Sequence, residues 1–202
     1  MSTRVLKVLL LTVCSVPLTW ATTAFSFTGE GSAINNGTGY SLGFQFTVTS
    51  PVLVDALGWW DAAAPDDLTD SHQVGIFDTS GDLLTSTTVL TTDPITDGFA
   101  YDSITPYLLS AGTYVISGVT GTNDEYASGV TGFTTAPWFT YGNNLYIVSS
   151  TLQFPTTNST SDGVGFFGPN FDATPTPEPA TFGLIGVGLL AGAVVFRKRQ
   201  AS

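Results

Sequence analysis

Four aspartates gather in one short polar stretch of the sequence: Asp61, Asp66, Asp67 and Asp70. Calcium takes six to eight oxygen ligands, largely from carboxylates and carbonyls, and surface loops of exported β-sandwiches can supply them. The spacing lacks the D-x-D-x-D-G pattern and the distal glutamate of an EF-hand loop. Two interpretations therefore stay open, a weak Ca²⁺ site and a polar loop that is only solvated.

The only histidine, His72, directly follows this stretch. A catalytic triad would need a serine nucleophile beside it, but the sequence has no G-x-S-x-G elbow. Ser71 is its neighbour on a predicted strand, where adjacent side chains point to opposite faces. We predict that His72 is a hydrogen-bonding residue that ties down the acidic loop. We assign no catalytic residue and expect a non-enzymatic domain.

Several aromatic residues offer a different chemistry, stacking on sugar rings. The candidates are Trp59, Trp60 and Trp138, with Tyr141 and Tyr146. On one strand Trp59 and Trp60 face opposite ways, so one of them is free to point outward. Packing in the core is the alternative fate of such residues.

Charge is distributed very unevenly along the chain. The formal net charge is −11, and the five basic residues are confined to the two ends, at Arg4, Lys7, Arg197, Lys198 and Arg199. Residues 8–196 therefore contain no lysine or arginine to neutralise phosphates, and this excludes nucleic acid as a partner. The acidity favours solubility of the domain.

The first 24 residues have the three parts of a secretory signal peptide. Two basic residues precede an apolar run over residues 8–16, and small residues occupy two candidate cleavage positions, after Ala21 and after Ala24. The run is too short to span a bilayer. We expect a cleaved signal peptide over residues 1–24. Its removal also removes Cys14, the only cysteine, and with it any disulfide or thiolate chemistry.

A second apolar run, residues 182–196, lies near the other end of the chain. As a helix it spans roughly 22 Å at ~1.5 Å per residue, which falls short of the ~30 Å hydrocarbon core. Snorkelling of the basic side chains that follow closes part of this gap. Because positive charge stays cytoplasmic, we predict a transmembrane helix over 182–196. Arg197, Lys198 and Arg199 are then a stop-transfer cluster in a cytoplasmic tail of residues 197–202.

The tripeptide Pro177-Glu178-Pro179, the apolar run and the terminal basic cluster together resemble the PEP-CTERM sorting signal. This signal belongs to exported proteins of Gram-negative bacteria that make extracellular polysaccharide. The resemblance covers about residues 175–200. It implies that an exosortase, a membrane cysteine transpeptidase or protease, recognises the tripeptide and processes the protein there. The two prolines keep this segment extended and out of a helix, as a processing enzyme requires.

Residues 25–172 read as an all-β domain. Leu42, Phe44, Phe46 and Val48 alternate with small or polar residues, and this predicts a strand with one buried face. Further strands follow at regular spacing, with turn signals at 79–82, 96–98, 110–112 and 141–144. We expect an antiparallel two-sheet sandwich of jelly-roll type. Residues 57–61 and 74–78 are predicted to pair as one hairpin. Residues 173–181 are predicted to be a proline-rich linker that carries the sorting motif.

Residues 57–89 and 99–118 also resemble a module that occurs in many PEP-CTERM proteins, with the pattern LG-aromatic-aromatic-D, a loop, then SH-x-VGI-aromatic-D. The resemblance implies a β-sandwich and export, and no activity. We therefore expect an exosortase-sorted surface or matrix protein that is associated with exopolysaccharide or biofilm. The alternatives are a carbohydrate-binding module, with or without Ca²⁺, and a hydrolase. The precursor would be anchored in the inner membrane before it reaches the surface.

Overall fold

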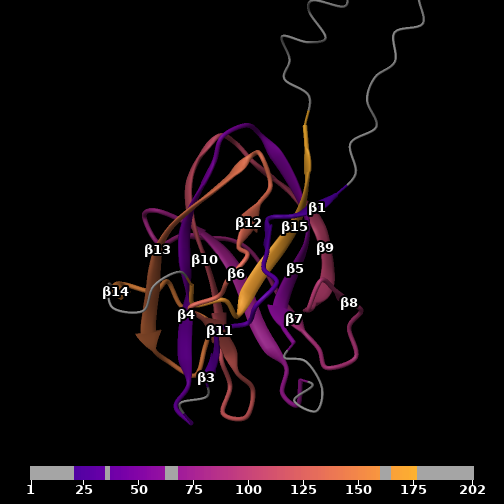
Figure 1. Cartoon of the computed structure of the whole chain (residues 1–202). Helices are drawn as coiled ribbons and strands as arrows, with labels where there is room; N and C mark the ends of the chain where they lie inside the picture. Colours follow the sequence, from indigo (N-terminus) through magenta and orange to yellow (C-terminus); the bar gives the residue numbers. More distant parts are fainter. Residues whose placement is uncertain (1–20, 35–36, 62–67, 160–164, 177–202) are drawn as a thin grey trace, which may run out of the picture.

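The computed structural model describes residues 21–34, 37–61, 68–159 and 165–176 (Figure 1). All regular structure in these ranges is β, and every strand pair is antiparallel. One sheet has five strands, in the order β1 (Thr22–Thr23), β15 (Pro169–Pro175), β5 (Val52–Trp60), β9 (Phe99–Leu109) and β8 (Ile95–Thr96). The prediction of an all-β sandwich is confirmed.

The second sheet has six strands. Their order is β14 (Thr157–Ser159), β13 (Phe139–Val148), β4 (Tyr40–Val48), β10 (Gly112–Val119), β6 (His72–Asp78) and β7 (Leu83–Val89). Two small ribbons complete the fold, β11 (Tyr126–Ser128) with β3 (Ser32–Ile34), and β12 (Thr134–Thr135) with β2 (Phe25–Ser26).

The pairing of the main strands is nested, as in a jelly roll. The hairpin β6–β7 is innermost, β5 pairs with β9 around it, β4 pairs with β10, and β1 pairs with β15 outermost. Successive pairs alternate between the two sheets, so the chain winds around the sandwich. Because the outermost pair joins the two ends of the domain, β1 lies beside the last strand (Figure 1).

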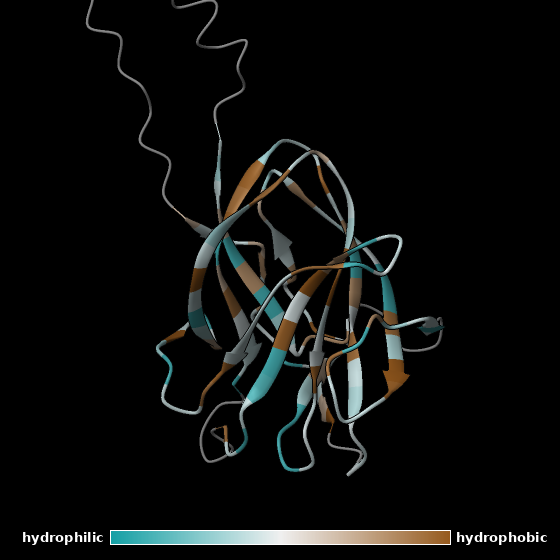
Figure 2. Cartoon of the chain, turned by 180° about the vertical axis from the view of Figure 1, so that it is seen from behind, coloured by the Kyte–Doolittle hydropathy of each residue, from teal (hydrophilic) through white to brown (hydrophobic). Residues whose placement is uncertain are grey.

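The core lies between the two sheets, and residue alternation along the strands supplies it (Figure 2). The four predicted inward residues of β4 are exposed by only 0–1%. Phenylalanines dominate the interior, and Phe25 packs against Phe167 with ring centroids 4.7 Å apart. Such aromatic clusters bury a large apolar area without any charged group.

Two predicted local structures are wrong because they depended on long-range pairing. The segments 57–61 and 74–78 are not a hairpin, since β5 and β6 belong to different sheets. The signal at 141–144 is not a turn between strands. It is a register shift inside β13, where the pairing with β4 jumps between Tyr141 and Asn144.

The boundaries of the domain also differ from those predicted. Residues 173–175 are not a linker, because they belong to β15 and pair with Val54, Leu53 and Val52 of β5. At the other end, Thr22 and Thr23 form β1, and Ala24 is fully buried. The domain therefore begins before residue 25 and extends past residue 172.

Candidate functional site

His72 lies at the start of β6 and points into the sandwich, where it is fully buried. Its ring stacks on that of Trp59 from β5 in the opposite sheet, with centroids 4.4 Å apart and planes within 2°. The position of His72 is fixed by strand alternation, which also sends Val74 and Ile76 inward. The histidine therefore bridges the two sheets as a flat, closely packed ring.

Both ring nitrogens of His72 face acceptors. Nδ1 lies 2.8 Å from the carbonyl oxygen of Val119, and Nε2 lies 2.9 Å from Oδ2 of Asp124. A carbonyl can only accept, so Nδ1 donates. Oδ2 of Asp124, which faces Nε2, also accepts a backbone N–H from Asp70. His72 therefore links the Val119 carbonyl to the Asp124 carboxylate through its two ring nitrogens.

Asp124 is held by the backbone of the acidic stretch. Its carboxylate accepts hydrogen bonds from the amide and hydroxyl of Thr69 and from the amide of Asp70, at 2.7–3.1 Å. Burial by itself would raise the pKa of Asp124, but these donors and His72 outweigh it and hold the pKa below its ordinary value. The carboxylate is therefore ionised and fully engaged.

The hydrogen-bonded pair of His72 and Asp124 has a structural role. His72 has no exposed atom and no free nitrogen, so it cannot exchange a proton with a substrate. It joins the acidic stretch to the β10–β11 connection through Asp124. The prediction that His72 ties down this loop is confirmed. No local sequence pattern identified Asp124 as its partner, since 52 residues separate them.

The proposed calcium ligands are only partly described. Oδ1 of Asp61 accepts the amide of Leu68 at 3.0 Å, and Oδ2 of Asp70 accepts the side-chain amide of Asn123 at 3.0 Å. Asp66 and Asp67 lie outside the described residues. Within the described ranges no group of three or more His, Cys, Asp or Glu residues is arranged to hold a metal ion. Calcium binding at this loop stays a prediction.

The three tryptophans predicted to stack on glycans are all buried. Trp59, Trp60 and Trp138 are exposed by 0%, 2% and 4%, so the prediction of stacking at these positions is wrong. Alternation along β5 does send Trp59 and Trp60 to opposite faces, but the face with Trp60 is covered by the N-terminal segment. Phe27 from that segment packs against Trp60, with ring centroids 6.4 Å apart.

A hollow on the outer face of the six-stranded sheet is the better candidate for a ligand site. After β13 the chain crosses this face in a segment that we call the outer loop, residues 149–156. Ser41 of β4 hydrogen-bonds with the amide and carbonyl of Gln153, and Gln73 of β6 accepts the amide of Leu152. The loop is thus fastened to two strands of the sheet.

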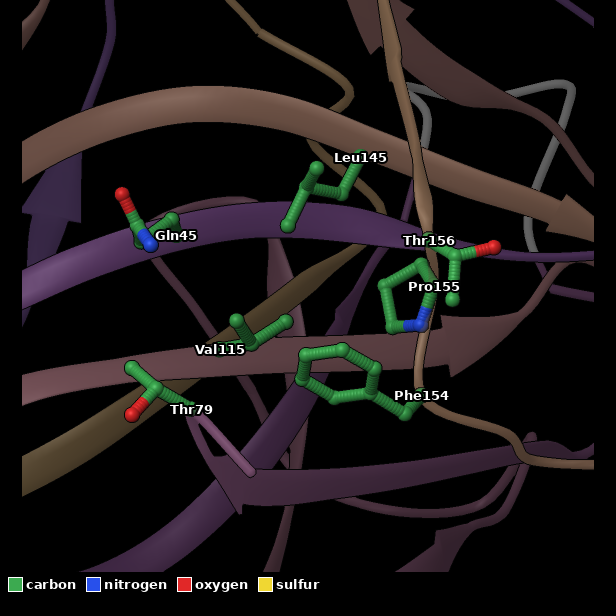
Figure 3. A pocket seen from close by; sticks show the side chains of 7 residues that line it. All are labelled: Gln45, Thr79, Val115, Leu145, Phe154, Pro155 and Thr156. Atoms are coloured by element: carbon green, nitrogen blue, oxygen red, sulfur yellow. The ribbon is translucent and has the colours of Figure 1, made fainter. Parts of the chain in front are cut away.

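The hollow beside the outer loop has a volume of about 260 Å³. Figure 3 shows Phe154 and Pro155 on one side of it and Gln45 and Thr79 on the other. None of the described residues that line it is charged; they are Gln45, Thr79, Val115, Leu145, Phe154, Pro155 and Thr156. The sequence did not reveal this site, because LYIVSSTLQF (145–154) reads as one continuous strand.

Two family models match the chain. The first is described as Domain of unknown function (DUF4082) and covers residues 27–165, which is more than half of the 202 residues. The chain belongs to the DUF4082 family. The second is the PEP-CTERM protein-sorting motif, over residues 175–200. No curated protein and no solved structure gave a match.

The sorting motif confirms the resemblance found in the sequence. This DUF4082 protein is exported, sorted toward the cell surface and processed through an exosortase. The motif residues Pro177, Glu178 and Pro179 and the basic cluster Arg197, Lys198 and Arg199 lie outside the described residues, as does the predicted helix 182–196. The part of the chain that the structure describes has no helix long and apolar enough to cross a membrane.

The sandwich reaches the residue before the sorting tripeptide. Both the amide and the hydroxyl of Thr176 donate to the carbonyl of Pro51 at 3.0 Å. The tripeptide begins at the next residue, Pro177. The described part of the domain therefore reaches the residue directly before the tripeptide.

Proposed function

We propose that this protein is a non-enzymatic component of the cell surface or extracellular matrix, associated with exopolysaccharide or biofilm. The observation that carries the proposal is the sorting motif at residues 175–200, attached directly to the sandwich. A non-enzymatic role is supported by the saturation of the one histidine. Every hydrogen-bonding atom of its ring is engaged inside the protein.

The route to the surface is part of the same proposal. The helix at 182–196 holds the precursor in the inner membrane, with Arg197, Lys198 and Arg199 in the cytoplasm, until the exosortase acts near Pro177-Glu178-Pro179. The apolar run and the positive-inside rule support this topology. After processing, the sandwich moves to the surface or the matrix.

The test compares the native host with a strain that lacks its exosortase. Intact mass and fractionation should show loss of the C-terminal segment and release from the membrane only when the exosortase is present. A third strain that makes no exopolysaccharide should release the processed protein into the medium instead of retaining it in the matrix. An intact C-terminus and inner-membrane retention in all strains would refute the proposal.

The outer hollow supports a second candidate function, binding of a neutral carbohydrate chain. Its lining combines the half-buried ring of Phe154 with the uncharged polar groups of Gln45, Thr79 and Thr156. Sugar rings bind to such surfaces through an aromatic face and a few hydrogen bonds. The acidic protein, with no lysine or arginine between residues 8 and 196, disfavours an anionic glycan.

Calorimetry of the exported protein with neutral and acidic polysaccharides from the host tests this candidate. Phe154→Ala should weaken binding of the neutral polymer at least tenfold. Leu108→Ala is the matched control, because this residue is exposed by 55% on the other sheet. Repeating the titration with Ca²⁺ and with a chelator shows whether the acidic loop takes part. Equal binding of the neutral polymer by both variants would rule out the hollow as the carbohydrate-binding site.

A further inference from the structure

A second cavity, of about 450 Å³, lies where the N-terminal strand meets the last strand of the domain. Its lining includes Thr22 and Thr23 of β1, Asp172 of β15 and Asp97 of the β8–β9 turn. Thr23 is directly opposite Asp172 in the ladder, and Thr22 is opposite Ala173. Residues 21–23 thus line the same cavity as two aspartates.

Asp172 is poorly compensated in this cavity. Its Oδ1 is buried and has no hydrogen-bond partner among the described residues. Burial raises the pKa of Asp172, the negative charges of Asp97 and Asp55 raise it further, and a hydrogen bond from Thr23 only partly opposes them. No lysine or arginine side chain can neutralise it, because residues 8–196 contain none. Oδ1 of Asp172 is therefore a hydrogen-bond acceptor with no basic side chain from residues 8–196 to pair with it.

The residues just after Ala21 are integral to the fold. The Thr23 hydroxyl hydrogen-bonds with the Tyr101 hydroxyl at 2.6 Å, and the side-chain amide of Asn170 donates to it at 3.3 Å. The amide of Ala24 donates to Phe171 at 2.9 Å, and its carbonyl accepts the amide of Ala136 at 2.9 Å. Cleavage after Ala24 would discard β1 and these contacts.

We propose that the exported precursor is cleaved between Ala21 and Thr22, and that the new α-ammonium group of Thr22 pairs with the carboxylate of Asp172 in this cavity. In the cleavage, water hydrolyses the Ala21–Thr22 amide. Ala21 leaves as the carboxylate end of the signal peptide, and the Thr22 nitrogen takes up a proton. Thr19 and Ala21 provide the small residues that a signal peptidase needs before the cut.

Maturation then supplies the one cation that this part of the domain lacks. The α-ammonium brings three N–H donors into the cavity that holds the unpaired Oδ1. It also offsets the mutual repulsion of Asp172, Asp97 and Asp55. The outermost strand pair of the jelly roll, β1 with β15, is therefore fastened by an ion pair that exists only after cleavage.

The cleavage site is tested by N-terminal sequencing and intact mass of the protein exported by its host. The expected first residue is Thr22. A first residue of Phe25, or any other start, would overturn the proposal. This readout concerns the N-terminus alone, so it is independent of exosortase processing and of any binding to polysaccharide.

The ion pair is tested by acylation of the α-amine with an amine-reactive ester. The mature domain contains no lysine, and Lys198, where the C-terminal segment is retained, is resolved by peptide mass. An unpaired α-amine has a pKa near 8, and a carboxylate within a few ångströms raises it by a unit or more. We expect acylation at pH 7.5 to be about tenfold slower in the parent protein than in Asp172→Asn.

Asp82→Asn is the matched control, because it removes the same charge from the exposed β6–β7 turn, away from the cavity. It should leave the acylation rate unchanged. If the parent protein acylates as fast as Asp172→Asn, there is no ion pair. If Asp82→Asn accelerates acylation as much as Asp172→Asn does, the effect is one of net charge, and the specific contact is refuted.

Discussion

Two carboxylates of the sandwich, Asp124 and Asp172, differ in their hydrogen-bond partners and in the direction of their pKa shifts. Asp124 is buried and Asp172 is half-buried, in a domain without lysine or arginine side chains. Asp124 is surrounded by two backbone amides, a hydroxyl and the ring of His72, and its pKa is lowered. Asp172 keeps an unpaired oxygen and has neighbours of its own charge, and its pKa is raised.

The difference shows how an acidic domain can do without basic side chains. Backbone N–H groups are abundant and fixed in position, so a loop that wraps a carboxylate can replace a lysine. This works at Asp124 because Thr69 and Asp70 belong to an irregular segment with free amides. It fails at Asp172, because that residue lies in β15, where the sheet ladder occupies the neighbouring amides.

Removing the satisfied carboxylate should have the largest effect. Asp124→Ala leaves the Thr69 and Asp70 amides and the buried His72 without their common partner. We expect the free energy of unfolding to fall by about 3–5 kcal/mol, as when one member of a buried pair is deleted. Urea denaturation measures the change. Asp82→Ala, at an exposed turn, should change stability by less than about 0.5 kcal/mol. A similar loss of unfolding free energy in Asp124→Ala and Asp82→Ala would show that the hydrogen bonds of Asp124 do not stabilise the domain.

Removing only the histidine's donors should have a smaller effect. His72→Phe keeps a flat ring over Trp59 but deletes the ring nitrogens that hydrogen-bond with Val119 and Asp124. Asp124 retains its backbone donors, so we expect a loss of about 2 kcal/mol, as for hydrogen bonds that involve a charged group. Thermal unfolding followed by circular dichroism is a suitable measurement. A loss as large as that of Asp124→Ala would show that the histidine, and not the loop backbone, stabilises the carboxylate.

Asp172→Asn should change stability with opposite signs in two forms of the mature protein. With a free α-amine, the substitution removes the proposed ion pair and destabilises by about 1 kcal/mol, a value limited by solvent screening. With an acetylated amine it removes an uncompensated buried charge and stabilises. Urea denaturation of the four species measures both effects. The same sign in both forms would leave Asp172 without its proposed partner.

The two carboxylates should also respond oppositely to pH. The folded pKa of Asp124 is lowered below 3.8, so its contribution is present above that value and is lost as the pH falls through the folded pKa. The folded pKa of Asp172 is raised, so in the acetylated protein its contribution is present below 3.8 and is lost as the pH rises through the folded value. Melting temperatures between pH 2 and 6 should show an acid loss that is absent in Asp124→Ala.

Local patterns in the sequence predicted much of the fold. Alternation placed Leu42, Phe44, Phe46 and Val48 in the core, and the same rule sends His72 inward. The predictions that were wrong depended on which strands pair with one another. Trp60 is buried because an N-terminal segment covers its face of β5, and β5 and β6 separate because each pairs with strands far along the chain.

The candidate sites were harder to predict for the same reason. His72 meets Asp124 across 52 residues, and Thr23 lies opposite Asp172 across a still longer span. No local pattern reports such contacts. The outer hollow depends on the outer loop turning back over the sheet, and a run of strand-forming residues concealed that turn. The sorting motif, by contrast, is read directly from consecutive residues and needed no structure.

The position of β15 sets the order of events during export. This strand lies between β1 and β5, so the five-stranded sheet stays open until residues 169–175 have emerged from the translocation channel. Those residues are followed at once by the sorting tripeptide. Closure of the sandwich and arrival of the exosortase signal therefore coincide in time. A chain halted before residue 169 would therefore lack both strand β15 and the sorting signal.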